Sequence, residues 1–355
     1  MSAPSLRNGG LISAMRIALI APPWTPVPPP LYGGIELVVD QLARGLVAAG
    51  HQVTLCTTGD STCPVPRHWV LPSADGIAIG TVVPELRHVI SAYEAVADHD
   101  VVHDHTMVGP FYAGRLPPLR VCTTVHGPLH EDLAELYRAL AGPVAVVAIS
   151  HAQRAAAPDI PVAAVIHHGL EAAAFPVGDG TGDERGDYVL FVGRMSPDKG
   201  AHRAVEVARR AGKRILLAAK MREPAEQAYF ADQVRPLLGP DAVYLGEVEH
   251  QQKLQLLAGA RAVLFPIRWN EPFGMVLLEA MACGTPVLAF PEGAVPEVID
   301  HGRTGFLCHD EDDMVRWLAR IDEIDRGQCR QAVEGYFSTT RMVADHVALY
   351  ERLLS

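Results

Sequence analysis

Residues 271–279 read EPFGMVLLE, and they follow the apolar run AVLFPI at positions 262–267. This order indicates a buried strand, a loop, and a helix that begins near Gly274. Similar strand–loop–helix units recur on both sides of it along the chain. Repeated units of this kind are typical of a parallel sheet covered by helices, so the sequence predicts an α/β protein.

The first half of the chain alternates short apolar runs with amphipathic segments. We expect helices at Glu36–Ala49 and Glu131–Leu140. The expected strands are Ile17–Ala21, Val53–Thr57, Val101–His105, Cys122–His126, Val144–Ser150 and Ala163–His167. Several of these runs are apolar on both faces, which favours strands buried inside a doubly wound domain.

The same rhythm restarts after the Gly- and Asp-rich segment PVGDGTGDERGD at 176–187, which has almost nothing to bury. The expected strands are Tyr188–Gly193, Ile215–Ala219, Val243–Gly246, Ala262–Pro266 and Val287–Phe290. The expected helices are Ala201–Ala211, Ala225–Leu238, Gln251–Ala258, Met275–Ala282 and an amphipathic tail over Arg330–Leu354.

The sequence thus predicts two doubly wound Rossmann-like domains that face a central cleft. We place a disordered leader at 1–14, with Met15 as a possible true start, the first domain at 15–172 and a linker at 173–187. The second domain takes 188–330, and a C-terminal helix at 331–355 returns to the first domain. Ligands of such sheets bind at the carboxyl ends of the strands, which is where the cleft should lie.

Composition excludes several classes of protein. The 355 residues carry a formal net charge of −11. Both halves are negative, which argues against a nucleic-acid partner. No run of 18 apolar residues is present, so no transmembrane segment is expected. The six cysteines form no C-x-x-C pair or framework spacing, which favours a reducing, cytoplasmic compartment.

The block at 271–279 also suggests a chemistry. A helix that begins at a glycine presents unpaired N–H groups and the positive end of its dipole, which suits a phosphate. Glu279, on an otherwise apolar stretch, would accept hydrogen bonds from both hydroxyls of a ribose, and Glu271 at the mouth would hold hydroxyls of a sugar. The structural alternative is that Glu271 caps the helix and Glu279 pairs with an arginine.

Two further loops suggest the same ligand. Arg194 and Lys199 lie in VGRMSPDKG (192–200), after an apolar strand, and could neutralise a diphosphate. The chain has only four lysines, so a lysine in this loop supports a role in ligand binding, although solvated loop charges remain an alternative. Gly33 and Gly34 follow the first strand and allow the backbone to approach a ligand closely.

Histidines lie at the expected ends of two strands. His126, in TTVHG, should lie at the edge of the cleft. His103 and His105 share a strand face with metal-compatible spacing, but no third ligand is evident nearby, so no metal is expected. The D-x-D at 98–100 precedes a strand and is interpreted as a solvated cap, and Asp310–Asp313 as the start of a helix.

Together these motifs resemble the retaining glycosyltransferases of family 4, which have the GT-B fold. The resemblance runs from Met15 to the end and rests on F-V-G-R-x-S-P-x-K-G followed by E-P-F-G-x-x-x-x-E-A-M-A-C-G-T-P-V. It implies a nucleotide-diphosphate sugar (UDP, GDP or ADP type) held by the second domain, and a small-molecule, glycan or glycoconjugate acceptor bound by the first. It implies no cofactor and no metal ion.

The resemblance also implies roles for single residues. Arg194 and Lys199 would clamp the diphosphate, and Glu279 would hold the ribose. Glu271 and His126 would contact the transferred sugar at the reacting centre. Gly274, Met275 and Val276 would give backbone N–H groups to the phosphates or the sugar. Gly33 and Gly34 would close over the phosphates from the other domain.

Other functions on this architecture fit less well. A sugar-nucleotide epimerase stays as the alternative, and it would work without an acceptor. A glycan phosphorylase needs a cofactor-bearing lysine late in the chain, and none follows Lys253. A nicotinamide dehydrogenase predicts G-x-G-x-x-G after the first strand, which is absent. The intact motif set also argues against a non-catalytic binding module. Acceptor contacts are expected from Trp24–Tyr32 and from the segment after His126.

Overall fold

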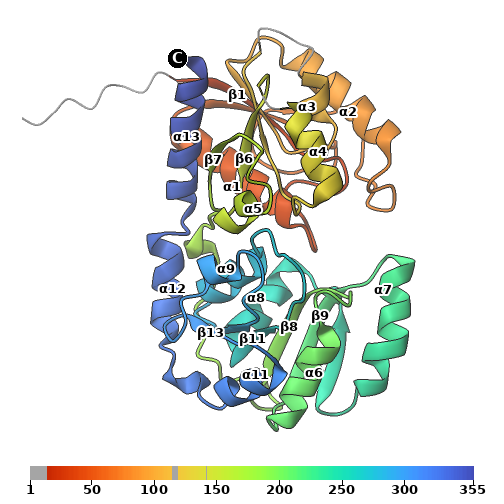
Figure 1. The fold of residues 1–355 in the computed structure, drawn as a ribbon, viewed down its shortest axis with the longest axis vertical. Helices are drawn as coiled ribbons and strands as arrows, with labels where there is room; N and C mark the ends of the chain where they lie inside the picture. The colour runs from red at the N-terminus through yellow and green to blue at the C-terminus, as the bar shows by residue number, and fades with distance from the viewer. Residues whose placement is uncertain (1–13, 114–118, 141) are drawn as a thin grey trace, which may run out of the picture.

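The computed structural model describes residues 14–113, 119–140 and 142–355. Its first half forms a seven-stranded parallel sheet with the strand order β3-β2-β1-β4-β5-β6-β7 (Figure 1). The strands are β1 (Arg16–Ile20), β2 (Gln52–Cys56), β3 (Arg67–His68), β4 (Val101–Asp104), β5 (Val121–Thr124), β6 (Ala145–Ala148) and β7 (Val162–Val165). The order reverses direction at β1, so β1 and β4 form the switch point beside which ligands of such sheets bind.

The second half forms a six-stranded parallel sheet in the order β10-β9-β8-β11-β12-β13. Its strands are β8 (Val189–Arg194), β9 (Ile215–Lys220), β10 (Ala242–Gly246), β11 (Ala262–Phe265), β12 (Val287–Ala289) and β13 (Gly305–Leu307). The strand order of this sheet reverses direction between β8 and β11. The motif with Arg194 and Lys199 lies at the end of β8, and the glutamate motif at 271–279 follows β11. The predicted fold class, two Rossmann-like domains, is therefore confirmed.

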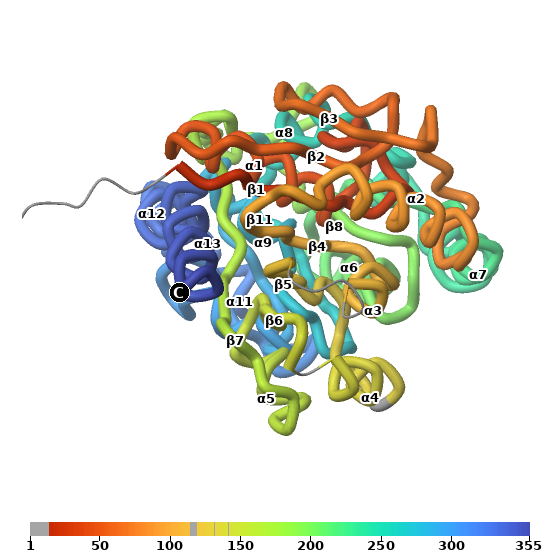
Figure 2. Tube along the Cα trace, turned by 90° about the horizontal axis from the view of Figure 1, so that it is seen from above, coloured from red at the N-terminus to blue at the C-terminus, as the bar shows by residue number. Residues whose placement is uncertain are grey.

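Helices cover both faces of each sheet (Figures 1 and 2). The first-half helices are α1 (Gly34–Ala48), α2 (Val82–Ala95), α3 (Gly109–Ala113), α4 (Glu131–Leu140) and α5 (His151–Ala156). The second-half helices are α6 (Ala201–Arg210), α7 (Pro224–Tyr229), α8 (His250–Gly259), α9 (Met275–Ala282), α10 (Val295–Val298), α11 (Glu311–Leu318), α12 (Arg326–Gly335) and α13 (Thr339–Leu354). The strands are apolar on both faces because each face packs against helices.

Several elements differ from the expectation. The strands β3 and β13, which are only two and three residues long, were not expected. Helix α2 was not expected because the apolar Val82 and Val83 at its start are exposed. The helix expected at 225–238 ends as an α-helix at Tyr229 and continues as one π turn and one 3-10 turn, and Pro236 lacks the N–H that an α-helix there would need.

The C-terminal tail forms two helices in place of the single one expected, with a break at Tyr336–Ser338. Helix α12 packs against α9 of the second domain, and α13 packs against α1 of the first (Figure 1). The approach is close, because a Cβ atom built on Gly45 would lie 2.5 Å from Val343. The tail therefore returns to the first domain as predicted, while the domain boundaries themselves stay predictions.

Candidate active site

A cleft lies between the carboxyl ends of the two sheets, and residues of both domains line it. It consists of a smaller and a larger pocket, which adjoin. The residues common to both are Tyr32, Gly33, Gly34, Lys199, Lys220, Glu271, Gly274 and Met275. Val276 and Glu279 line only the smaller pocket, and His126 and Arg194 only the larger one. All ten residues expected at the site thus line one cleft, although the sequence places them up to 246 positions apart, from Gly33 to Glu279.

Helix α9 points its N-terminus into this cleft. Its N-cap is Gly274, which has a φ of 89° and no side chain to cap the helix. A left-handed φ favours glycine, and a Cβ atom here would lie 3.0 Å from Leu277. The N–H groups of Met275 and Val276 have no hydrogen-bond partner among the described residues. The helix end therefore offers free donors and a positive dipole to an anion.

Helix α1 approaches the same place from the first domain. Its N-cap is Gly33, again with no side-chain cap. A Cβ atom on Gly33 would lie 2.6 Å from Pro29, and one on Gly34 would lie 3.8 Å from the Cγ of Met275. The first turns of α1 and α9 therefore face each other across the cleft, and both present positive dipole ends to whatever lies between them.

Lys199 and Glu271 form a buried ion pair in the floor of the cleft. Trp269 donates its Nε1–H to Glu271 Oε2 over 2.9 Å, and the Lys199 ammonium lies 4.4 Å from the Trp269 ring centroid. Glu271 was expected at the helix mouth, either to hold hydroxyls of a sugar or to cap the helix, but α9 has no side-chain cap. The structure shows instead that a lysine and an indole hold its side chain in place.

Glu279 is also paired. It is 4% exposed, and its Oε1 accepts a hydrogen bond of 2.5 Å from Lys253 of α8. Only Oε1 has a partner of this kind among the described residues, which leaves Oε2 without one. The structural alternative from the sequence, an arginine partner for Glu279, is therefore wrong, because the partner is a lysine.

Two lysines at the cleft were missed as site residues. Lys253 lines the smaller pocket, and Lys220 lines both pockets and pairs with Glu223 at 2.6 Å. With Lys199, they put three of the chain's four lysines at the cleft. The scarcity of lysine was the signal that could have identified them.

Arg194 ends β8 and lines the larger pocket, 3.4 Å from Asp198. The turn that follows it needs Gly200, which has a φ of 77°, and a Cβ atom there would lie 2.6 Å from the carbonyl oxygen of Pro266. This turn brings Arg194 and Lys199 to the same side of the cleft. Their side chains differ in exposure, because Lys199 is buried and Arg194 is partly open to solvent.

The wall contributed by the first domain consists largely of neutral groups. His126 and His168 line the larger pocket, and their rings stack with centroids 5.4 Å apart. Burial lowers the pKa of His126 to about 3 and that of His168 well below its usual value. Glu36 of α1 lines the same wall, and burial raises its pKa to about 7. In all three groups burial disfavours the charged form, because desolvation penalises a charge.

His103 is not available to a metal ion. Its Nδ1 lies 2.7 Å from the hydroxyl of Tyr350, and its Nε2 lies 2.7 Å from that of Thr124. The D-x-D at 98–100 directly precedes β4, as expected, and Asp98 and Asp100 both contact Arg16 there. Asp310 caps α11 by accepting from the Asp313 N–H at 2.7 Å, as expected of a helix start.

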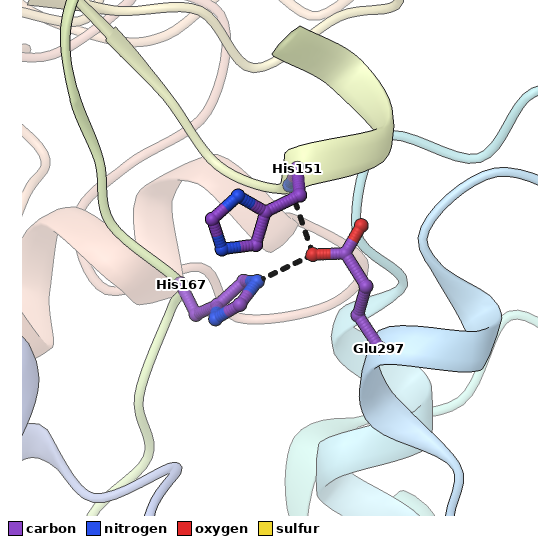
Figure 3. Close-up of side chains that lie close together, drawn as sticks. All are labelled: His151, His167 and Glu297. Atoms are coloured by element: carbon purple, nitrogen blue, oxygen red, sulfur yellow. Dashed lines mark hydrogen bonds and ion pairs between the residues drawn. The ribbon is translucent and has the colours of Figure 1, made fainter. Parts of the chain in front are cut away.

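A second contact joins the two domains beside the cleft (Figure 3). Glu297 of α10 accepts hydrogen bonds from the N–H groups of His151 and Ala152, at 2.8 and 2.7 Å, and its Oε2 lies 2.7 Å from His167 Nε2. The two histidines and the glutamate lie close enough together to suggest metal ligands. Both carboxylate oxygens already accept protein donors, so Glu297 acts here as a link between the domains.

Comparisons with known proteins agree with this architecture. The family model described as Glycosyltransferase Family 4 matches residues 32–174, and the model described as Glycosyl transferases group 1 matches residues 180–332. The solved structure of AviGT4, a glycosyltransferase involved in avilamycin A biosynthesis, superposes with a TM-score of 0.70 and 28% identity. The superposition covers 96% of this chain and 98% of that one.

Curated relatives share parts of the chain or most of it. A glycogen synthase of Mycobacterium tuberculosis is 32% identical over 154 residues, which are 42% of this chain and 36% of that protein. This match therefore spans only about a third of the relative's length. A phosphatidyl-myo-inositol mannosyltransferase of Mycolicibacterium smegmatis is 28% identical over 344 residues, which are 88% of this chain and 86% of that protein.

Within the described residues, no helix is both long and apolar enough to cross a membrane. The two family models lie one on each domain, and residues of both motifs on which the resemblance was based line the cleft between these domains. The chain therefore belongs to family 4 of the glycosyltransferases and has their GT-B fold.

Proposed function

We propose that this protein transfers a sugar from a nucleotide-diphosphate sugar to a hydroxyl group of an acceptor, with retention of the anomeric configuration and without a metal ion. The observation that carries the proposal is the convergence of two uncapped helix N-termini, α1 and α9, on a cleft that also holds Lys199. A diphosphate fits these donors because each one favours negative charge.

The donor would lie along the second domain. Lys199 and Arg194 would neutralise the charge that develops on the departing diphosphate, in place of a metal ion. Glu279 would use its unpaired Oε2, with Oε1 shared between Lys253 and the ligand, to accept hydrogen bonds from the ribose hydroxyls. Because a 2′-deoxyribose lacks one of these hydroxyls, UDP, GDP or ADP sugars are expected over dTDP sugars.

The reaction would take place between Glu271 and His126, with both residues in contact with the transferred sugar. The acceptor oxygen attacks the anomeric carbon on the face from which the diphosphate leaves, and the acceptor proton passes to the departing phosphate oxygen. Retention is supported by the family membership, and neither residue is a clear covalent nucleophile. The acceptor, a small molecule, glycan or glycoconjugate, would occupy the larger pocket near Trp24.

The compartment is also part of the proposal. All six cysteines are buried and free, which suits a reducing cytoplasm.

The test is calorimetric titration with UDP, GDP, ADP and dTDP, each with and without a divalent metal ion. One diphosphate that binds in the micromolar range without metal supports the proposed site and identifies the base. Failure of all four to bind would mean that the helix ends are structural only. Incubation of the selected sugar nucleotide without an acceptor separates the epimerase alternative, which predicts a new sugar nucleotide instead of free diphosphate.

A further inference from the structure

A row of buried histidines leads from the interior of the first domain to the cleft. The ring centroids of His103 and His105 lie 4.1 Å apart, those of His105 and His126 5.2 Å, and those of His126 and His168 5.4 Å. His105 is 4% exposed and directly follows β4, whereas His126 lines the larger pocket. The row therefore connects His126, the proposed sugar contact, to His105 and His103, which do not line the cleft.

Among the described residues, the side chain of His105 has one hydrogen-bond partner. Its Nδ1 lies 2.9 Å from Nε2 of His126. Both nitrogens of the neighbouring His103 are already bonded, to Tyr350 and Thr124. The Nε2 atom of His105 is buried and has no partner among the described residues. The hydrogen bond to His126 is therefore the interaction that determines where the proton of His105 lies.

Only one of the two possible proton arrangements leaves no buried N–H group unpaired. Burial lowers the pKa of both rings, so each ring is neutral and carries one proton. If His126 donated from Nε2, the proton of His105 would be on its buried, unpartnered Nε2. Orphaned buried N–H groups are rarer in proteins than orphaned acceptors. The favoured arrangement has His105 donating from Nδ1 to an unprotonated Nε2 of His126.

This arrangement fixes the chemistry that His126 presents to the cleft. With Nε2 accepting from His105, the one proton of His126 lies on Nδ1. That atom has no hydrogen-bond partner among the described residues, and the ring lines the cleft. The ring can donate a hydrogen bond there, but it cannot accept a proton at Nδ1.

We propose that His105 is a positioning residue, which donates to Nε2 of His126 and so keeps the His126 proton on Nδ1, where it is donated to an oxygen of the transferred sugar. This inference rests on the proposed function, in which His126 contacts that sugar. His126 then acts as a neutral hydrogen-bond donor, and the departing diphosphate remains the group that takes up the acceptor proton.

The proton positions are measured directly by ¹⁵N–¹H correlation NMR of the full chain labelled with ¹⁵N-histidine. The His126 signals are assigned by their loss in His126→Gln. The expected spectrum at neutral pH shows a protonated Nδ1 and an unprotonated Nε2 for His126. A protonated Nε2 in the wild-type protein would overturn the proposal, whatever the enzyme's activity.

Two variants of His105 test the consequence. In His105→Ala the partner of His126 is lost, and the proton should move to Nε2, which a free imidazole prefers. Turnover of the sugar nucleotide with water as acceptor should fall about tenfold, as expected for one lost hydrogen bond. In His105→Asn an amide N–H takes the place of Nδ1–H, which should restore both the Nδ1 proton and most of kcat.

The outcomes separate this inference from the proposed function. An unchanged His126 proton and unchanged kcat in His105→Ala would refute the role of His105. If His126→Gln turns over the donor at the wild-type rate, the proposed sugar contact fails, while the NMR spectrum still reports on the His105–His126 pair. A low kcat in both His105 variants with the Nδ1 proton retained would show that His105 only supports packing.

Discussion

The two walls of the cleft are built from opposite kinds of chemistry. The wall from the second domain carries charged side chains in ion pairs, such as Lys199 with Glu271 and Lys253 with Glu279. The wall from the first domain carries His126, His168 and Glu36, whose shifted pKa values all disfavour the charged form. Burial is the common cause on the neutral wall, because desolvation penalises a charge that has no partner.

The difference indicates how the two domains would divide the reaction. The Lys199 ammonium has three N–H donors, so it could contact a diphosphate oxygen while it keeps Glu271 as a partner. A neutral wall instead forms hydrogen bonds to sugar hydroxyls without attracting further ions. We therefore expect the charged side chains near the diphosphate to come from the second domain, and the first domain to add the N-terminus of α1 and neutral side chains. The predictions that follow test this division, beginning with the largest expected effect.

Removal of a charge from the second-domain wall should have the largest effect. We expect Lys199→Ala to lower kcat by about a hundredfold or more, because a contact to the departing diphosphate is lost. The change also leaves Glu271 buried and unpaired, so rates are to be compared per folded protein, determined by circular dichroism. Lys213→Ala is the matched control, since Lys213 pairs with Asp187 and does not line the cleft. Near-normal turnover in Lys199→Ala would exclude the diphosphate role.

The neutral wall makes a prediction about pH. Burial raises the pKa of Glu36 from 4.5 to about 7, so the folded protein keeps this proton between those values while the unfolded chain loses it. Its contribution to stability is therefore present below about pH 4.5 and is lost as the pH rises to 7. Glu36→Gln should be more stable than the wild type at pH 8 by roughly 2–3 kcal/mol, and equal to it near pH 4.5.

Urea unfolding of both proteins across this range measures the effect. Groups that titrate elsewhere contribute equally to both proteins, so the difference isolates Glu36. Parallel stability profiles for the two proteins would show that the Glu36 carboxylate is ionised in the folded state, and the contrast between the walls would then be weaker.

The proposed contact between Glu279 and the ribose gives another test of the second-domain wall. The preferred nucleoside diphosphate should bind more tightly than its 2′-deoxy analogue by about 1–3 kcal/mol, because the analogue leaves a buried Glu279 lone pair unsatisfied. Glu279→Gln should reduce this preference, since an amide offers only one acceptor oxygen. Calorimetric titration of the wild-type protein and of Glu279→Gln with the two nucleotides measures this difference in affinity and its reduction. Equal affinities in the wild-type protein would place the ribose elsewhere.

A pair of glycine variants separates backbone strain from ligand binding. Gly274 and Gly212 both have left-handed φ values, 89° and 65°, but only Gly274 lies at the cleft. Each Gly→Ala change should lower the free energy of unfolding by about 1–2 kcal/mol. Only Gly274→Ala should also weaken binding of the diphosphate, because its Cβ atom lies at the mouth of α9. Equal diphosphate binding by both variants would contradict the anion site at this helix.

The fold could be predicted largely because its strands are buried on both faces and read as apolar runs. Eleven expected strands lie within one or two residues of observed ones, and the expected bounds of α4 and α9 match those observed. Elements with few buried residues escaped prediction, as β3 and the exposed start of α2 show. The break before α13 was missed because both halves of the tail carry the same amphipathic pattern.

The sequence by itself predicted ten residues that line the cleft, because the carboxyl ends of parallel strands place their loops at one edge, but it missed Lys220 and Lys253. It did not reveal the partners of those residues. Only the tertiary structure showed that Lys253 of α8 reaches Glu279 of α9, and that His105 lies against His126 from the neighbouring strand. Such contacts depend on side-chain packing between segments far apart in the chain, and no spacing along the sequence records them. The ion pairs of the second-domain wall and the burial that keeps the first-domain wall neutral both depend on such packing.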